Sequence, residues 1–141
     1  MKVINIDEYE IDKVETFLKA IEGIKIDINV ISNASVLLDD KNEIIGLISF
    51  EVFGTNGLIR YFVFKKVINE ESLESLFSNL VIKAKNKRVN KLFSFVHNEN
   101  TTPIFEFLGF VKIDKTLVYI EEKNFEQMYN QDAFVYCYDV A

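Results

Sequence analysis

The spacing of apolar residues in the first third of the chain predicts a strand, a helix and one further short element. Residues 1–6 are the strand candidate. A helix follows, because apolar side chains recur at intervals of three and four: Ile11, Val14, Phe17, Leu18 and Ile21. Asp7 is placed to cap the start of this helix and Gly23 to cap its end. From residue 24 to residue 31 every second position is apolar, which favours a strand and leaves a second short helix open.

The middle of the chain predicts three strands joined as an antiparallel meander, at Ser35–Leu38, Glu43–Phe53 and Leu58–Phe64. The polar run Asp39–Asn42 forms the first turn. Gly54–Gly57 closes the second hairpin with Asn56-Gly57, a dipeptide typical of tight turns, at its tip. The nearly unbroken apolar run Tyr61–Phe64 indicates that both faces of the sheet are covered in its middle.

The second half of the chain predicts a long helix, a strand, a short helix and two final strands. The long helix spans Ser72–Arg88, with apolar residues at helical spacing: Leu73, Leu76, Phe77, Leu80, Val81 and Ala84. Leu92–Val96 follows as a strand, so the two strands on either side of the helix form a right-handed crossover. Thr102 and Pro103 begin the short helix, which ends at Gly109. The last strands are Val111–Ile120 and Ala133–Val140.

Neither a repeat nor a linker interrupts this order, so the sequence predicts one α/β (α+β) domain over residues 1–141. With 141 residues and 49% hydrophobic side chains, the chain is large enough to bury a core. The formal net charge of −6 argues against nucleic acid and against an anionic membrane as partners. A lone cysteine, Cys137, excludes an internal disulfide and a cysteine-rich zinc site. We therefore expect a cytoplasmic protein without a metal.

One segment of the second half is distinctive. It reads Asn98-Glu-Asn-Thr-Thr-Pro-Ile-Phe-Glu-Phe-Leu-Gly-Phe110, an asparagine at a strand end followed by a short helix that ends in Gly-Phe. Together with the order of the elements, this segment resembles the closing motif of the GNAT acyltransferase superfamily. Asp132–Tyr136 likewise resembles the last strand of that family. The likeness in element order covers nearly the whole chain, and Asn98, Gly109 and Phe110 match at the level of the motif.

The resemblance implies a GNAT-like fold with a V-shaped mixed sheet of about six to seven strands flanked by helices. The sheet would open between Leu58–Phe64 and Leu92–Val96, and acetyl-CoA would be the co-substrate held in that notch. The pantetheine arm would pair with the backbone of three residues of the first strand, Phe62, Val63 and Phe64. Asn98 would contact the coenzyme from the second strand. Enzymes of this family transfer an acetyl group to an amine by direct attack.

Two parts of the sequence depart from the family. Its phosphate-binding loop carries a basic residue or glutamine and then two glycines, and these positions are Ile68, Asn69 and Glu71 here. Glycine leaves the backbone amides bare, whereas a Cβ holds a phosphate away from them. Glu70 and Glu71 would also repel a diphosphate from the first turn of the helix. In the short helix, Phe105 replaces a tyrosine that protonates the leaving thiolate in the family; it could contact the coenzyme but has no proton to give.

The candidate catalytic residues are Glu51 and Tyr61, on the strands that flank the inferred notch. Acyl transfer to an amine requires a group that removes a proton from the ammonium, directly or through water. His97, the single histidine, is an alternative base at the strand end, although a lone histidine without an orienting carboxylate is more often structural. Lys65 and Lys66 could hold a phosphate as point charges or simply face solvent.

The sequence therefore leaves two functions open. The first is a GNAT-like N-acetyltransferase that uses acetyl-CoA and takes a small-molecule or peptide amine as acceptor. The second is a non-catalytic GNAT-like module that binds another ligand or associates with itself, as a homodimer would. The missing glycines and Phe105 favour the second function, while the order of elements supports the fold in either case.

Overall fold

The computed structural model describes residues 2–6, 8–21, 26–96, 99–114, 119–120, 123–124 and 134–140. The chain divides into two compact units. The first unit takes residues 1–51 and 60–83, and the second takes residues 52–59 and 84–141. The single domain expected over the whole chain stays a prediction.

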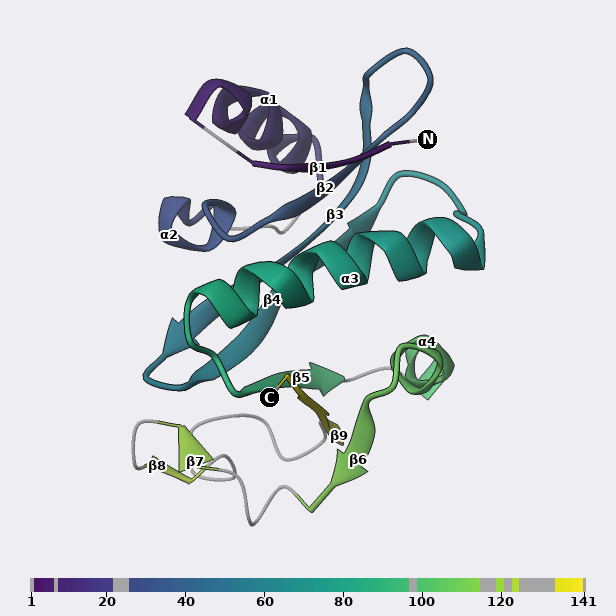
Figure 1. Cartoon of the computed structure of the whole chain (residues 1–141). Helices are drawn as coiled ribbons and strands as arrows, with labels where there is room; N and C mark the ends of the chain where they lie inside the picture. Colours follow the sequence, from purple (N-terminus) through teal and green to yellow (C-terminus); the bar gives the residue numbers. More distant parts are fainter. Residues whose placement is uncertain are drawn as a thin grey trace. The chain divides into compact units, whose positions relative to one another are not determined.

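Among the described residues, seven strands form one mixed sheet in the order β1-β2-β3-β4-β5-β9-β6 (Figure 1). Their bounds are Lys2–Asn5 for β1, Ser35–Leu38 for β2, Ile44–Phe53 for β3, Asn56–Phe64 for β4, Lys91–Val96 for β5, Val111–Ile113 for β6 and Phe134–Asp139 for β9. β2 runs antiparallel to β1 and β3, and β9 runs antiparallel to β5 and β6. β4 pairs with β5 in parallel, from Asn56 opposite Lys91 to Leu58 opposite Phe93. The predicted mixed sheet of six to seven strands is confirmed.

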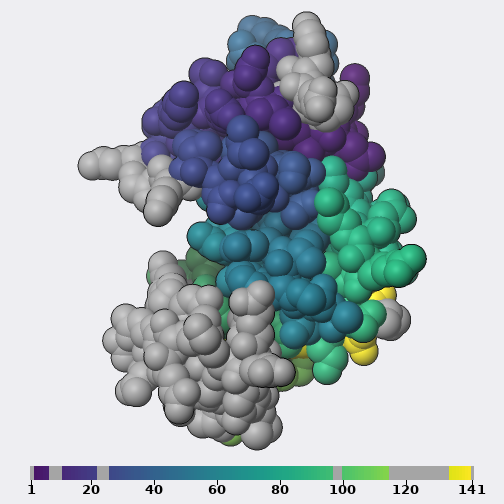
Figure 2. Space-filling view, turned by 90° about the vertical axis from the view of Figure 1, so that its left-hand side faces the viewer, coloured from purple at the N-terminus to yellow at the C-terminus, as the bar shows by residue number. Residues whose placement is uncertain are grey.

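Two helices of the first unit pack on one face of its strands. α1 spans Glu8–Lys19 and α2 spans Ile28–Ile31, and Figure 2 shows them side by side in purple and blue. Their buried side chains join residues of β2, β3 and β4 in one apolar cluster, which includes Val14, Phe17, Leu18, Val30, Ile31, Val36, Leu38, Leu47 and Tyr61. Successive strand residues point to opposite faces, so Ser35 and Leu37 face away from α1 and α2.

The third helix, α3, spans Glu70–Asn86 and packs on the face that Ser35 occupies. The Ser35 hydroxyl donates a hydrogen bond to the carbonyl of Leu76 at 2.9 Å, and Asn79 Nδ2 donates to that hydroxyl at 2.9 Å. A buried hydroxyl is unfavourable unless it is bonded, so these two bonds fix α3 on β2. In the part of the chain that the structure describes, no helix is long and apolar enough to cross a membrane.

The strand favoured for residues 24–31 is wrong in the part that the structure describes, because residues 28–31 form α2, the short helix that the pattern left open. The carboxylate of Asp27 accepts the N–H of Asn29 at 3.0 Å and caps the helix. Val30 and Ile31 are both buried in the same cluster, which neighbouring residues of a strand could not achieve. Ile28 is 54% exposed. The apolar side chain of Ile28 continued the alternation that is typical of a strand, although Ile28 is exposed. Asp27, which can cap a helix, was the local signal for α2.

The predicted tip of the second hairpin is also wrong. The turn consists of Gly54 and Thr55, and Gly54 adopts a φ of +63° that suits glycine. Asn56 and Gly57 lie inside β4, where Gly57 is opposite Leu92 of β5. Parallel pairing with β5 therefore extends β4 by two residues beyond the prediction.

In the second unit, β9 lies between β5 and β6, and a 3-10 turn at Glu99–Thr101 leads into α4, Thr102–Phe107. Gly109 follows α4 with a φ of +98°, as the predicted helix end requires. The single strand predicted for Val111–Ile120 is wrong. β6 ends at Ile113, and β7, Tyr119–Ile120, pairs with β8, Lys123–Asn124, in a separate hairpin.

Candidate functional site

The side chain of Asn69, in the junction between β4 and α3, caps the start of α3. The N–H of Ser72 donates to Asn69 Oδ1 at 2.7 Å, and the N–H of Leu73 donates to the Asn69 carbonyl at 3.1 Å. An asparagine in this position satisfies one of the N–H groups that a helix start leaves without an intrahelical partner. α3 therefore begins at Glu70, two residues earlier than the apolar spacing predicts.

Two acids occupy the first turn of α3. Glu70 and Glu71 are both exposed, and their negative charge complements the positive end of the helix dipole. A diphosphate binds a helix start through free N–H groups and that same positive charge. Because Asn69 bonds the Ser72 N–H and the two acids offset the dipole, the junction does not fit a coenzyme diphosphate.

The two lysines after β4 lie near other partners. Lys65 lines an open pocket of about 570 Å³ together with α1 residues and with Asn42, Glu43 and Ile44. Lys66 adds to the lowering of the Asp39 pKa, which results first from the backbone N–H of Glu43. Both cations are thus placed beside the turn that joins β2 to β3.

The predicted pantetheine strand is half-buried. Phe62, Val63 and Phe64 all retain partial exposure. Val63 packs against the cluster of α1 and α2, whereas the rings of Phe62 and Phe64 meet edge to face at 5.2 Å between centroids. Gly46 makes room for this pair, because a Cβ there would collide with the Phe64 ring. The strand end is therefore packed on both faces while its side chains stay partly exposed.

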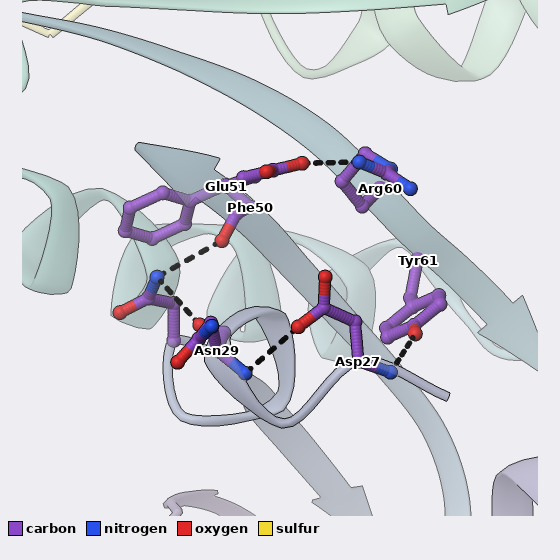
Figure 3. Close-up of polar contacts among 7 residues, drawn as sticks. Asp27, Asn29, Phe50, Glu51, Arg60 and Tyr61 are labelled. Carbon is purple, nitrogen blue, oxygen red and sulfur yellow. Dashed lines mark hydrogen bonds and ion pairs between the residues drawn. The ribbon is translucent and has the colours of Figure 1, made fainter. Parts of the chain in front are cut away.

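Glu51, a candidate catalytic residue, forms an ion pair with Arg60 (Figure 3). The carboxylate Oε1 accepts from Arg60 Nη1, and the side chains are 28% and 43% exposed. The ion pair fixes the position of a partly exposed carboxylate, and a catalytic role for Glu51 stays a prediction. The sequence did not reveal Arg60 as its partner, although the two residues stand on consecutive strands.

Tyr61, the other candidate, is buried in the core cluster of the first unit. Its hydroxyl oxygen accepts the backbone N–H of Asp27 at 3.0 Å (Figure 3). Asp27 in turn caps α2 through its carboxylate. The phenol therefore holds the start of α2 on β4, and a catalytic role for Tyr61 stays a prediction.

Asn33 is a buried polar residue that sequence reasoning missed. Its Nδ2 donates to the carbonyl of Phe50 at 3.0 Å and lies 3.4 Å from the carbonyl of Asn29. Within the described part of the chain, Asn33 Oδ1 and Ser49 Oγ are buried without a hydrogen-bond partner. Only the position of an asparagine just after a short helix could have drawn attention to it.

Phe105 of the second unit lies in an aromatic stack. Its ring meets Phe110 edge to face at 5.3 Å and stacks on Tyr136 at 6.2 Å. The Tyr136 hydroxyl donates to Glu106 at 3.3 Å, and burial raises the pKa of this phenol. Phe105 is only 6% exposed, so it serves the core, and its contact with a coenzyme stays a prediction.

Two predicted residues, His97 and Asn98, lie outside the described residues. Among the residues that the structure describes, no group of three or more His, Cys, Asp or Glu side chains is arranged to hold a metal ion. Burial raises the pKa of the Cys137 thiol, which disfavours the thiolate that a nucleophile would need.

No protein-family model matches the sequence, and no curated protein matches it either. Solved structures do match the fold. N-acetylglutamate synthase from Neisseria gonorrhoeae, complexed with coenzyme A and N-acetyl-glutamate, gives a TM-score of 0.73 at 16% identity over 99% of this chain. This chain spans 35% of that one.

Two further structures match along their whole length. A GNAT-family acetyltransferase from Staphylococcus aureus Mu50 gives a TM-score of 0.71 at 12% identity, with 99% of each chain covered. The Mycobacterium tuberculosis protein Rv2747, in complex with CoA and NLQ, gives 0.70 at 14% identity, also with 99% of each chain covered. The fold that the resemblance implies is confirmed: this chain has the fold of the GNAT acetyltransferases.

Proposed function

We propose that this protein is an N-acyltransferase that moves an acetyl group from a pantetheine thioester such as acetyl-CoA to an amine. The observation that carries the proposal is the fold, which matches the structure of a GNAT-family acetyltransferase over 99% of both chains. Two of the matched structures contain coenzyme A. A fold alone supports many functions, so the residues of the site have to support the same chemistry.

The end of β4 supports it from the residues themselves. Phe62, Val63 and Phe64 form a half-buried strand whose side chains are held on both faces. An extended ligand with amide groups can pair with such a strand as another strand would. The pantetheine arm has two amides and no charge, and it is the part of the donor that these residues suit.

In the proposed reaction, the amine nitrogen attacks the carbonyl carbon of the thioester directly. A carbon–nitrogen bond forms, the carbon–sulfur bond breaks, and the thiolate leaves. Glu51 is our candidate to accept the proton that the amine loses, since its carboxylate is partly exposed and fixed by Arg60. The N–H of Val63 or of a neighbour would stabilise the oxyanion. Solvent would protonate the thiolate, because Phe105 cannot.

The acceptor would be a cationic amine, either a small molecule or a peptide. The net charge of −6 favours the approach of cations to the protein. A reducing cytoplasm, expected from the lone cysteine, would also keep a thiol product free.

Release of free thiol from acetyl-CoA and from S-acetylpantetheine, measured with a panel of amines, tests the proposal. Glu51→Gln should lower kcat by about a hundredfold, because an amide cannot accept the proton. The matched control is Glu74→Gln, which removes an exposed carboxylate in the second turn of α3 and should leave kcat unchanged. Thiol release from neither donor with any amine would contradict the proposal.

A non-catalytic module is the second candidate, and the hydrogen bond between Asn69 and Ser72 favours it. Such a protein would keep the fold and use it to bind a different ligand or a second copy of itself. β1 and β6 end the sheet, and an edge strand offers unpaired backbone groups to a further strand. Sedimentation of the purified protein as a stable dimer, together with no thiol release, would favour this candidate.

A further inference from the structure

We propose that this protein recognises its acyl donor through the pantetheine thioester alone, so that pantetheine thioesters without a nucleotide serve at least as well as acetyl-CoA. The inference rests on the acyl transfer proposed above. Three features of the β4–α3 junction carry it: a bonded helix start, two acidic side chains, and the position of two lysines.

The bonded helix start comes first. N–H groups at the start of a helix hold a phosphate when no other acceptor occupies them. Here Asn69 Oδ1 accepts the Ser72 N–H at 2.7 Å, which is short for a neutral hydrogen bond and well formed. A diphosphate would have to displace this side chain, and the loss of such a cap would weaken binding by about fivefold.

The two acids in the first turn of α3 also weaken the binding of a diphosphate. Glu70 and Glu71 place two carboxylates in the first turn, where a bound diphosphate would add two more negative charges. Both side chains are exposed, so the repulsion is moderate and is screened by salt. It nevertheless opposes the attraction that a helix start normally offers to an anion.

The lysines do not restore that field. Lys65 lines the pocket that residues of α1 and of the β2–β3 turn also line, Glu43 among them. Lys66 acts on the carboxylate of Asp39 in the same turn. The cations that follow β4 therefore lie beside the turn that joins β2 to β3, and the nucleotide end of a donor would meet the two exposed carboxylates of α3.

The end of β4 is the part of the junction region that suits the pantetheine arm of a donor. Phe62, Val63 and Phe64 present extended backbone and partly exposed side chains, which suit an uncharged arm with two amides. The acids of α3 do not repel such an arm. Selection for the donor would thus come from the arm and its acyl group, with no contribution from the nucleotide.

Ligand-observed NMR titration of the whole protein with pantetheine and, separately, with CoA measures this directly. We expect CoA to bind no more tightly than pantetheine. The triple variant Asn69→Gly/Glu70→Gln/Glu71→Gln should bind CoA about tenfold more tightly than the wild type and leave pantetheine binding unchanged. Glu74→Gln, the matched control on the same helix, should change neither affinity. Circular dichroism of the triple variant verifies that α3 is retained.

The outcomes separate this inference from the proposed function. Wild-type protein that binds CoA about tenfold more tightly than pantetheine would overturn the inference, even if acyl transfer takes place. Preferential binding of pantetheine without thiol release from any donor would support the inference and contradict the proposed function. No binding of either ligand would overturn both.

Discussion

The side chain of Asn69 accepts the backbone N–H of Ser72 at 2.7 Å, and this bond closes the start of α3. The same residue stands where the GNAT resemblance leads one to expect a glycine. Asparagine at this position removes a glycine that the phosphate loop of the family would need. The same asparagine stabilises α3, the helix that covers β2.

Replacing Asn69 should show how much its cap contributes to the stability of the protein. Asn69→Ala removes the acceptor and should lower the free energy of unfolding by about 1 kcal/mol, whereas Asn69→Gly should cost only a few tenths. Urea denaturation measures both values. Ser78→Ala, an exposed change in the middle of α3, is the control and should lie within about 0.5 kcal/mol of the wild type. Equal stability of wild type and Asn69→Ala would show that the cap contributes nothing.

The affinity for CoA should depend on salt concentration because of the two acids of α3. If Glu70 and Glu71 repel the nucleotide of CoA, added sodium chloride screens that repulsion, and CoA should bind more tightly as the salt concentration rises. Pantetheine has no charge, so its affinity should not change. Isothermal titration at low and at physiological ionic strength measures both. CoA affinity that falls with salt would indicate a cationic phosphate site and contradict this account.

Tyr61→Phe should weaken the anchor of α2. The change leaves the N–H of Asp27 without its acceptor and should lower the free energy of unfolding by about 1 kcal/mol. Tyr136→Phe, which removes another buried phenol, is a matched control for the loss of a hydroxyl. If thiol release falls far more for Tyr61→Phe than the loss of folded protein explains, Tyr61 also takes part in the reaction.

Gly46→Ala should disturb the candidate pantetheine strand. A Cβ at this position meets the ring of Phe64, which must then leave its edge-to-face contact with Phe62. Overpacking of this kind costs about 1–3 kcal/mol. Chemical denaturation measures the cost, and NMR shifts of the Phe62 and Phe64 rings report the displacement. Gly54→Ala probes a glycine with open space around it and separates steric collision from the strain of a positive φ.

The protein should lose stability at alkaline pH because the phenol of Tyr136 is buried. Burial raises the pKa of its phenol above the value of about 10 that tyrosine has in an unfolded chain. The folded protein therefore holds this proton more tightly, so the contribution to stability is complete below pH about 10 and is lost as the pH rises through the folded pKa. Urea denaturation between neutral and alkaline pH should show a smaller loss for Tyr136→Phe than for the wild type. Identical pH profiles would contradict the assignment.

Most elements of this fold could be predicted from the sequence, because their signals lie between residues close in the chain. Helical spacing predicted α1 and α3, and Thr102, Pro103 and Gly109 marked the two ends of α4. The failure at the second hairpin occurred where a distant partner decided the outcome. Gly57 looked like a turn residue, yet pairing with Leu92 of β5 placed it inside a strand.

The sequence by itself determined which chemistry the candidate site lacks: bare glycines after β4 and a proton donor at Phe105. Only the tertiary structure decided what the replacing side chains do. It placed Lys65 beside α1, joined the Tyr61 hydroxyl to Asp27, and enclosed Phe105 among aromatic rings. These contacts join residues far apart in the chain, so they depend on how strands pair and helices pack, which no local pattern contains.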